Sequence, residues 1–200
     1  MLDPNSLPLS AAYVAALPRG LDSYPQCRVR TAVSRLTLER FPKLLAHPGI
    51  ADEYKQRLRG ALADGEWMPE TVGTTLRILT REIVFESDAD YKAWTFEISS
   101  EVFRRPAYRV LMYVMSPALV MLGATRRWNA FREGTKLVAN VSGNVGDIRL
   151  TFPAQLYPLL VLEGFGEAFR ASLVAARARN VQLALDDAQP EGARWSVSWD

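Results

Sequence analysis

The chain has 200 residues, of which 48% are hydrophobic and 23% charged, and its formal net charge is +2. This balance is typical of a globular protein and excludes a disordered or fibrous chain. Surface scaling indicates that about 70% of the unfolded chain's surface becomes buried on folding. We therefore expect a single domain over residues 1–200, with a mainly helical part (1–134) followed by a part rich in strands (135–200).

Cysteine usage and terminal sequence indicate a cytoplasmic protein. Cys27 is the only cysteine, so the chain forms no internal disulfide and lacks the ligands for a cysteine-based zinc site. Residues 1–5 include no basic start before an apolar stretch, so they do not resemble a secretory signal. The longest uncharged run, residues 110–125, is interrupted by Ser116-Pro117 and is too short to span a bilayer.

Basic and acidic residues alternate in blocks along the chain. Residues 19–59 hold nine basic and four acidic side chains, 61–101 three basic and nine acidic, and 102–132 six basic and no acidic. Packing between helices of opposite charge explains this pattern without a ligand. The alternative is an Arg-rich helical face that binds nucleic acid. Such a face would require these residues on one exposed surface: Arg28, Arg30, Arg35, Arg104, Arg105 and Arg126.

Helical periodicity runs through the first two-thirds of the chain. Apolar residues recur every three or four positions in 25–41, 50–62 and 87 to about 104, which predicts three helices. Another helix is expected to open at Trp67-Met68-Pro69-Glu70, because a proline in the first turn loses no hydrogen bond. Ser87 and Asp90 are spaced as in a capping box, which favours a helix start there.

Two more helices are predicted before residue 135. Arg105-Pro106 ends the preceding helix and begins a short one that reaches about residue 115. Ser116-Pro117 combines an N-cap hydroxyl with a first-turn proline. The helix that begins there is expected to end at Gly134, since glycine adopts the left-handed cap conformation most readily.

From Thr135 the hydrophobic period changes from helical to two. Alternation on both sides of a glycine-containing turn at 142–146 predicts a β-hairpin. A long helix is expected to start at about residue 154 or 158 and to end at 177–180, and two alternating segments, 181–185 and 194–199, follow it around a polar loop. Strands with one apolar and one polar face predict a four-stranded antiparallel sheet that helices cover on one side. The predicted class is α+β, a helical N-terminal two-thirds packed on a C-terminal sheet of ββαββ order.

No catalytic or metal-binding arrangement stands out. His47, the only histidine, lies in a predicted loop, where a hydrogen-bonded turn residue is the commoner role. The acidic pairs at 52–53 and 186–187 lie where helix caps and solvation explain them. Gly164 and Gly166 lie inside a predicted helix and indicate close approach of another element. We expect no enzymatic activity, metal or cofactor; the enzymatic alternative is an unrecognised site of carboxylates and arginines.

Six segments form a recognisable pattern: Leu17–Pro25, Trp67–Glu70, Ser116-Pro117, Arg127–Thr135, the helix with Gly164 and Gly166, and Trp195–Trp199. Together they resemble a paralogous family of uncharacterised domains known from myxobacteria. This resemblance covers most of the chain and implies no chemistry, because the family has no established activity. The C-terminal order of elements also resembles vinyl-reductase-type sensor domains and TRAPP-type trafficking subunits.

The wider resemblance implies a dimerising α+β domain with an internal apolar pocket, used for sensing or scaffolding. Phenol-sensing members hold zinc through several C-terminal cysteines, which this chain lacks. Haem-binding nitric-oxide relatives need a proximal histidine, and the surroundings of His47 do not match that context. Some trafficking subunits have an acylated buried cysteine; Cys27 is the only candidate for one, and a plain buried cysteine is the expected role.

The sequence therefore predicts a non-enzymatic regulatory module, homodimeric, that senses a ligand or serves as a protein-binding scaffold. An apolar small molecule or acyl chain would occupy a pocket between the sheet and the helices. The residues expected to line that pocket are Tyr108, Met112, Met115, Trp128, Phe131, Phe165, Phe169 and Trp195. Ordinary core packing is the alternative role for each of them.

Overall fold

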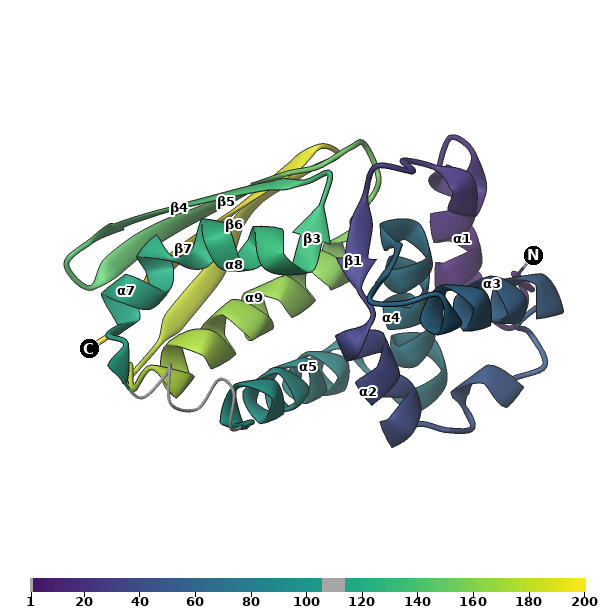
Figure 1. The fold of residues 1–200 in the computed structure, drawn as a ribbon, viewed down its shortest axis with the longest axis horizontal. Helices are drawn as coiled ribbons and strands as arrows, with labels where there is room; N and C mark the ends of the chain where they lie inside the picture. The colour runs from purple at the N-terminus through teal and green to yellow at the C-terminus, as the bar shows by residue number, and fades with distance from the viewer. Residues whose placement is uncertain (1, 106–113) are drawn as a thin grey trace.

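The computed structural model describes residues 2–105 and 114–200. They form a set of helices and two antiparallel sheets, joined by turns and loops (Figure 1). The helices described are α1 (Pro8–Ala16), α2 (Ala32–Arg40), α3 (Asp52–Ala63), α4 (Glu70–Val84), α5 (Asp88–Arg104), α7 (Pro117–Leu122), α8 (Ala124–Phe131) and α9 (Leu159–Ala175). The strands described are β1 (Arg28–Arg30), β2 (Trp67–Pro69), β3 (Arg132–Glu133), β4 (Lys136–Ser142), β5 (Val145–Thr151), β6 (Gln182–Gln189) and β7 (Gly192–Ser198). The short helix predicted after Pro106 falls mostly outside these residues.

The larger sheet has the order β4-β5-β7-β6, with every neighbouring pair antiparallel. This confirms the α+β class and the four-stranded antiparallel sheet. The predicted alternation also holds, because Leu150 and Val197 are buried while Arg149 and Ser196 on the same strands point the other way and are exposed. The last two strands are longer than predicted, since β6 continues through the expected polar loop to Gln189 with an irregularity in register after Leu185.

Helix α9 lies between this sheet and α5, so that both of its faces are covered (Figure 1). Its two internal glycines face these neighbours. A Cβ on Gly166 would lie 3.0 Å from Leu183 and 3.2 Å from Trp195 of the sheet, whereas one on Gly164 would lie 3.7 Å from Tyr91 and Thr95 of α5. Close approach of other elements, predicted for these glycines, is confirmed for the sheet side of the helix.

A second, three-stranded sheet of order β2-β1-β3 joins the helical part to the rest of the chain. The prediction of one helix over 25–41 was wrong at its start, because residues 28–30 form β1 and α2 begins only at Ala32. Val29 is buried and pairs with Met68 in β2 and Arg132 in β3. Residues 67–69 likewise form a strand, so that Pro69 is the N-cap of α4 rather than part of its first turn.

Local capping signals were predicted well, whereas one helix end was not. Ser87 accepts a hydrogen bond from the backbone N–H of Asp90, and Ser116 accepts one from Leu119, as the sequence predicts. The helix that starts after Ser116 divides at Gly123 into α7 and α8 and ends at Phe131. The predicted end at Gly134 was wrong, because residues 132–133 extend as β3 to pair with β1.

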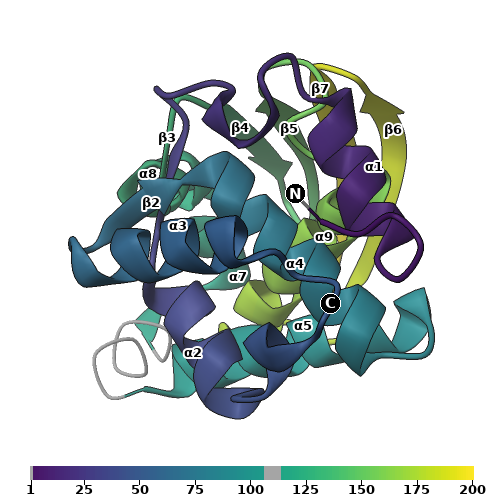
Figure 2. The ribbon, with the colours of Figure 1, turned by 90° about the vertical axis from the view of Figure 1, so that its right-hand side faces the viewer.

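Two hydrophobic clusters form the core. One fills the space beneath the four-stranded sheet, and the other lies among α1, α3 and α4, which stand in front of that sheet when the helical end is viewed in Figure 2. Two tyrosine hydroxyl groups tie the N-terminal segment to the residues after β5: the Tyr13 hydroxyl donates to the carbonyl of Leu156 at 3.0 Å, and that of Tyr24 donates to the carbonyl of Ala154 at 2.7 Å. Across the residues described, no helix is both long and apolar enough to cross a membrane.

Candidate ligand-binding cavity

A partly enclosed cavity of about 220 Å³ lies among the helices, on the side of α9 that faces away from the four-stranded sheet. Its walls come from β1, α2, α4, α5, α8, β3 and α9. Most of the wall is apolar, and Gly73, Gly164 and Ala168 are the smallest residues in it. We call this space the helical cavity.

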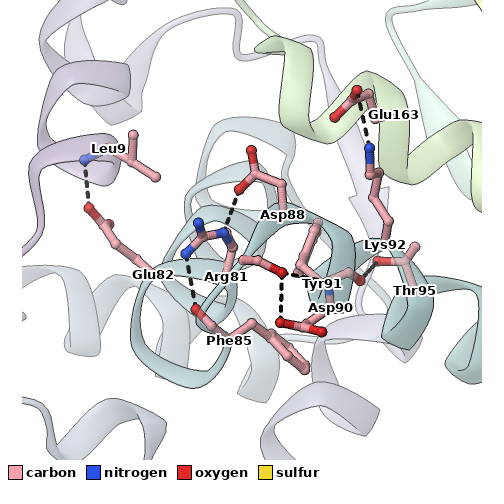
Figure 3. Close-up of polar contacts among 11 residues, drawn as sticks. Leu9, Arg81, Glu82, Phe85, Asp88, Asp90, Tyr91, Lys92, Thr95 and Glu163 are labelled. Carbon is pink, nitrogen blue, oxygen red and sulfur yellow. Dashed lines mark hydrogen bonds and ion pairs between the residues drawn. The ribbon is translucent and has the colours of Figure 1, made fainter.

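One wall of the helical cavity is α5, which presents an apolar stripe at helical spacing. The stripe consists of Tyr91, Trp94, Ile98 and Val102. The N-terminal end of α5 is held in place by Arg81 of α4, which pairs with Asp88 and donates to the carbonyl of Phe85, as Figure 3 shows. On its other side, Lys92 pairs with Glu163 of α9 at 3.4 Å. The first contacts tie α5 to α4, and the last one ties α5 to α9.

The opposite walls are formed by aromatic residues of α8 and α9. Trp128 lies edge to face with Phe165, with ring centroids 5.3 Å apart, and is tilted toward Phe169 at 6.2 Å. Such pairs stabilise rings in fixed orientations by about 0.5–1.5 kcal/mol beyond their buried area. The rings therefore form a firm wall rather than loose filling.

Of the eight residues predicted to line a pocket, Trp128, Phe131, Phe165 and Phe169 line the helical cavity. Met115 and Trp195 do not, since Met115 packs against the core under the sheet and Trp195 is fully buried within that core. The two others, Tyr108 and Met112, lie outside the residues described.

The expected location of the pocket also differs from that of the cavity. The space between the sheet and α9 is filled, because the Trp195 ring nitrogen comes within 3.2 Å of where a Cβ on Gly166 would be. Room is left instead on the far side of α9. Binding of a ligand to the lining residues stays a prediction.

The charged residues of the cavity wall are all arginines. Arg30, Arg77, Arg127 and Arg132 line the cavity, and among the described residues of the lining there is no Asp, Glu, His or Cys. The formal charges on the wall itself are therefore all positive, and the carboxylates that compensate them lie behind it or at its edge.

Two of these arginines share one buried carboxylate behind the wall. Glu70, at the first position of α4, has no exposed surface. Its Oε1 accepts a hydrogen bond from Nη1 of Arg77 at 3.2 Å, and its Oε2 lies 3.6 Å from Nε of Arg132, too far for a hydrogen bond. Both Glu70 Oε2 and Arg132 Nε are buried and lack a hydrogen-bond partner within the described chain. We call Glu70, Arg77 and Arg132 the buried triad.

Aromatic rings hold the guanidinium of Arg132 at the cavity. Its Cζ lies 4.4 Å from the ring centroid of Trp128 and 4.5 Å from that of Phe165. Cation–π attraction of this kind is worth up to about 2 kcal/mol where water is excluded. Burial lowers the pKa of Arg132, while the nearby Glu70 carboxylate acts in the opposite direction.

The other two arginines are bound to partners at the edge of the cavity. Arg30 pairs with Glu66 and stacks on Trp67 with 4.5 Å between Cζ and the ring centroid. Arg127 donates from Nη2 to the backbone carbonyl of Val120, and burial lowers its pKa. Only Arg30 therefore has a carboxylate of its own among the residues described.

The buried triad was missed in the sequence, although one signal for it exists. Glu70 was interpreted only as an acidic residue favoured by the start of a helix. Glu70 and Arg77 are seven residues apart, so they lie on one face of α4, and Gly73 and Thr74 on the same face are buried. A charged pair on a buried helix face predicts a buried ion pair, but not its third member from β3.

Other sequence candidates lie elsewhere. His47 accepts a hydrogen bond from the backbone N–H of Gly49 at 3.2 Å, the turn role that the sequence favours. Cys27 is buried and donates to the carbonyl of Gly134 at 3.4 Å. Among the side chains described, no three of His, Cys, Asp and Glu gather as they would around a metal ion.

Several arginines of the alternative nucleic-acid face are occupied within the protein. Arg28 and Arg30 pair with Glu133 and Glu66, and Arg35 donates to backbone carbonyls at the end of α3. Three of the six residues required for that face thus already have partners, which weakens the nucleic-acid alternative.

No protein-family model matches the chain, and no curated protein matches it. Two solved structures align with it at low identity. A point mutant of T. tengcongensis H-NOX has 8% identity and a TM-score of 0.42, over 83% of this chain and 96% of that one. A Cs H-NOX mutant that contains the unnatural amino acid 4-cyano-L-phenylalanine has 10% identity and a TM-score of 0.40, over 86% and 96%. TM-scores below 0.5 reflect a loose similarity that says nothing about what this chain binds.

Proposed function

We propose that this chain is a non-enzymatic regulatory module that binds a small, mainly apolar molecule in the helical cavity. The observation that supports this most directly is the cavity itself. Protein interiors pack about as densely as organic crystals and leave few voids larger than a water molecule. A volume of about 220 Å³ exceeds the ~150 Å³ of an engineered apolar cavity that takes up benzene.

The chemistry of the lining favours binding over catalysis. General acid–base chemistry needs a group that exchanges a proton near neutral pH and reaches the bound molecule. Arginine does not release its proton in that range, and the described lining offers hydroxyl groups, aromatic rings and aliphatic side chains besides its arginines. The Glu70 carboxylate is buried behind the wall and does not line the cavity.

Filling the cavity tests the proposal. We expect Ala168→Leu, which adds bulk inside the cavity wall, to abolish binding of decan-1-ol or decanoate, followed through the fluorescence of the lining residues Trp94 and Trp128. The matched control is Ala12→Leu, the same change at an exposed position of α1. This control should bind like the unmodified chain.

Two results would contradict the proposal. One is the absence of binding of both probes to the unmodified chain, and the other is equal binding by Ala168→Leu and the unmodified chain. Native mass spectrometry of protein purified from cells adds an independent measurement, since a co-purified apolar molecule should be lost in Ala168→Leu and kept in Ala12→Leu. If the unmodified chain binds neither probe and Ala168→Leu is as stable as the unmodified chain, the results favour a protein-binding scaffold instead.

A further inference from the structure

Resting on the function proposed above, we propose that the ligand of the helical cavity is an amphiphile with a carboxylate, and that Arg132, with Arg77 beside it, binds this group. The inference concerns the chemical class of the ligand. It depends on the charge of the cavity wall, on the partners of each arginine and on the shape of the apolar space.

The charges around the cavity do not cancel. Glu66 compensates Arg30 at the cavity edge, but Glu70 is the only carboxylate shared by Arg77 and Arg132. The buried triad therefore has a formal charge of +1. A buried charge without a partner is costly in free energy, and an anion in the adjoining space would reduce that cost.

The hydrogen-bonding capacity of Arg132 is also largely unused. A guanidinium has five N–H donors, and Nε of Arg132 is buried without an acceptor in the described chain, its carboxylate neighbour being 3.6 Å away. The buried hydroxyl of Tyr157 lies close to this guanidinium. Trp128 and Phe165 fix the plane of the group without using its donors. Arg132 lines the cavity, and a guanidinium fixed in its plane suits the two oxygens of a carboxylate.

The remaining wall defines the rest of the ligand. The stripe on α5 and the rings of α8 and α9 are apolar, so they favour an alkyl or aromatic body over a sugar or a nucleotide. Their contact area supplies affinity, whereas the single charged end at Arg132 supplies orientation. A fatty acid or an aryl carboxylate has both parts, and an inorganic anion has only one.

The test compares two probes that differ only in their polar end, decanoate and decan-1-ol. We expect the unmodified chain at pH 7.5 to bind decanoate at least about tenfold more tightly, the ratio that charge-assisted hydrogen bonds provide. In Arg132→Met the ratio should fall to about two or less, because decanoate binding weakens while decan-1-ol binding stays within about twofold.

Arg30→Met is the matched control. It makes the same substitution in the same cavity wall, at an arginine that Glu66 already compensates. We expect it to keep the preference for decanoate. Arg132→Lys, which keeps the charge and loses the planar fork, should give an intermediate ratio. Circular dichroism spectra that match the unmodified chain show that each variant is folded.

The outcomes separate this inference from the function on which it rests. Equal binding of the two probes by the unmodified chain would overturn the carboxylate inference and leave an apolar cavity. An unchanged preference in folded Arg132→Met, or the same loss in Arg30→Met, would also overturn it. Failure of both probes to bind would instead contradict the proposed function itself.

Discussion

Glu70 is the only carboxylate that the buried triad offers to two guanidinium groups, and none of its surface is exposed. An ion pair of this kind contributes little relative to an apolar core, but removal of one member leaves charges buried without compensation. The importance of Glu70 for stability is therefore best measured by replacing its carboxylate.

We expect Glu70→Gln to lower the free energy of unfolding by about 3–5 kcal/mol, because both arginines then lose their buried counter-charge. Chemical denaturation followed by circular dichroism measures this change. Glu66→Gln is the control, since the side chain of Glu66 is 78% exposed where it pairs with Arg30. Its effect should remain below about 1 kcal/mol. Similar losses in the two variants would show that the triad is not a buried ion cluster.

The buried thiol of Cys27 gives the chain a pH dependence of defined sign. Burial raises the pKa of Cys27 to about 11, and the negative charge of Glu70 acts in the same direction. The thiol of the unfolded chain ionises at a lower pH, so from about pH 9 to 11 the unfolded state binds fewer protons than the folded state. Stability contributed by the neutral thiol is then lost as the pH rises.

We therefore expect the free energy of unfolding of the unmodified chain to fall more steeply between about pH 9 and 11 than that of Cys27→Ala. Buried tyrosines, whose pKa values are also raised, affect both proteins alike and cancel in the comparison. Parallel curves for the two proteins would mean that the thiol ionises as freely in the folded state as in the unfolded state.

The sequence predicts local features, such as helix N-caps, that depend on residues within one helical turn of each other. Ser87 and Ser116 were assigned as N-caps because the hydroxyl and the N–H that it accepts from lie three residues apart. The ion pair between Glu70 and Arg132 depends on how α4 packs against β3, more than sixty residues later in the chain. No local pattern contains that information.

The two glycines inside α9, Gly164 and Gly166, have different roles. Both cost helix propensity, by about 1 kcal/mol each relative to alanine. Gly166 allows the sheet to approach, whereas Gly164 faces α5 across an ordinary contact distance.

Gly164→Ala should raise the free energy of unfolding by about 0.5–1 kcal/mol, since the added methyl group fits and the helix is favoured. Gly166→Ala should be less stable than Gly164→Ala by about 1 kcal/mol or more, because its methyl group would press on Leu183 and the buried ring of Trp195. Thermal and chemical denaturation of the two variants side by side measure this difference. Equal stabilities would mean that the sheet yields easily to α9.

Long strands could be predicted from the sequence, whereas short ones could not. The strands of the larger sheet have seven or eight residues, enough for alternation to stand out from a helical period. Strands β1 and β2 have three residues each, and β3 has two. Such segments lack a detectable period, and their partners are distant in the chain: Val29 pairs with residues 68 and 132. The cavity lies beside this small sheet, whose strands the sequence analysis did not predict.

For the whole molecule, we expect a single cooperative unfolding transition over residues 1–200. Val14 packs against both hydrophobic clusters, α4 contributes residues to both, and the three-stranded sheet joins distant segments of the chain, so neither cluster should unfold alone. Tryptophan fluorescence and far-ultraviolet circular dichroism should give coincident denaturation curves. Separate transitions, or a folded fragment of residues 2–105, would indicate two domains. Homodimer formation stays a prediction that analytical ultracentrifugation tests.

Strand β7 lies in the interior of the larger sheet, between β5 and β6, although it is the last of the four strands along the chain. Until β7 has been synthesised, the β5 edge of the β4–β5 hairpin is unpaired and β6 has no partner in the sheet. Backbone N–H and C=O groups along β5 and β6 then stay open to pairing with other chains. The nascent protein should consequently depend on chaperones until that strand has been made, and a truncation before Gly192 should aggregate rather than yield a smaller folded product.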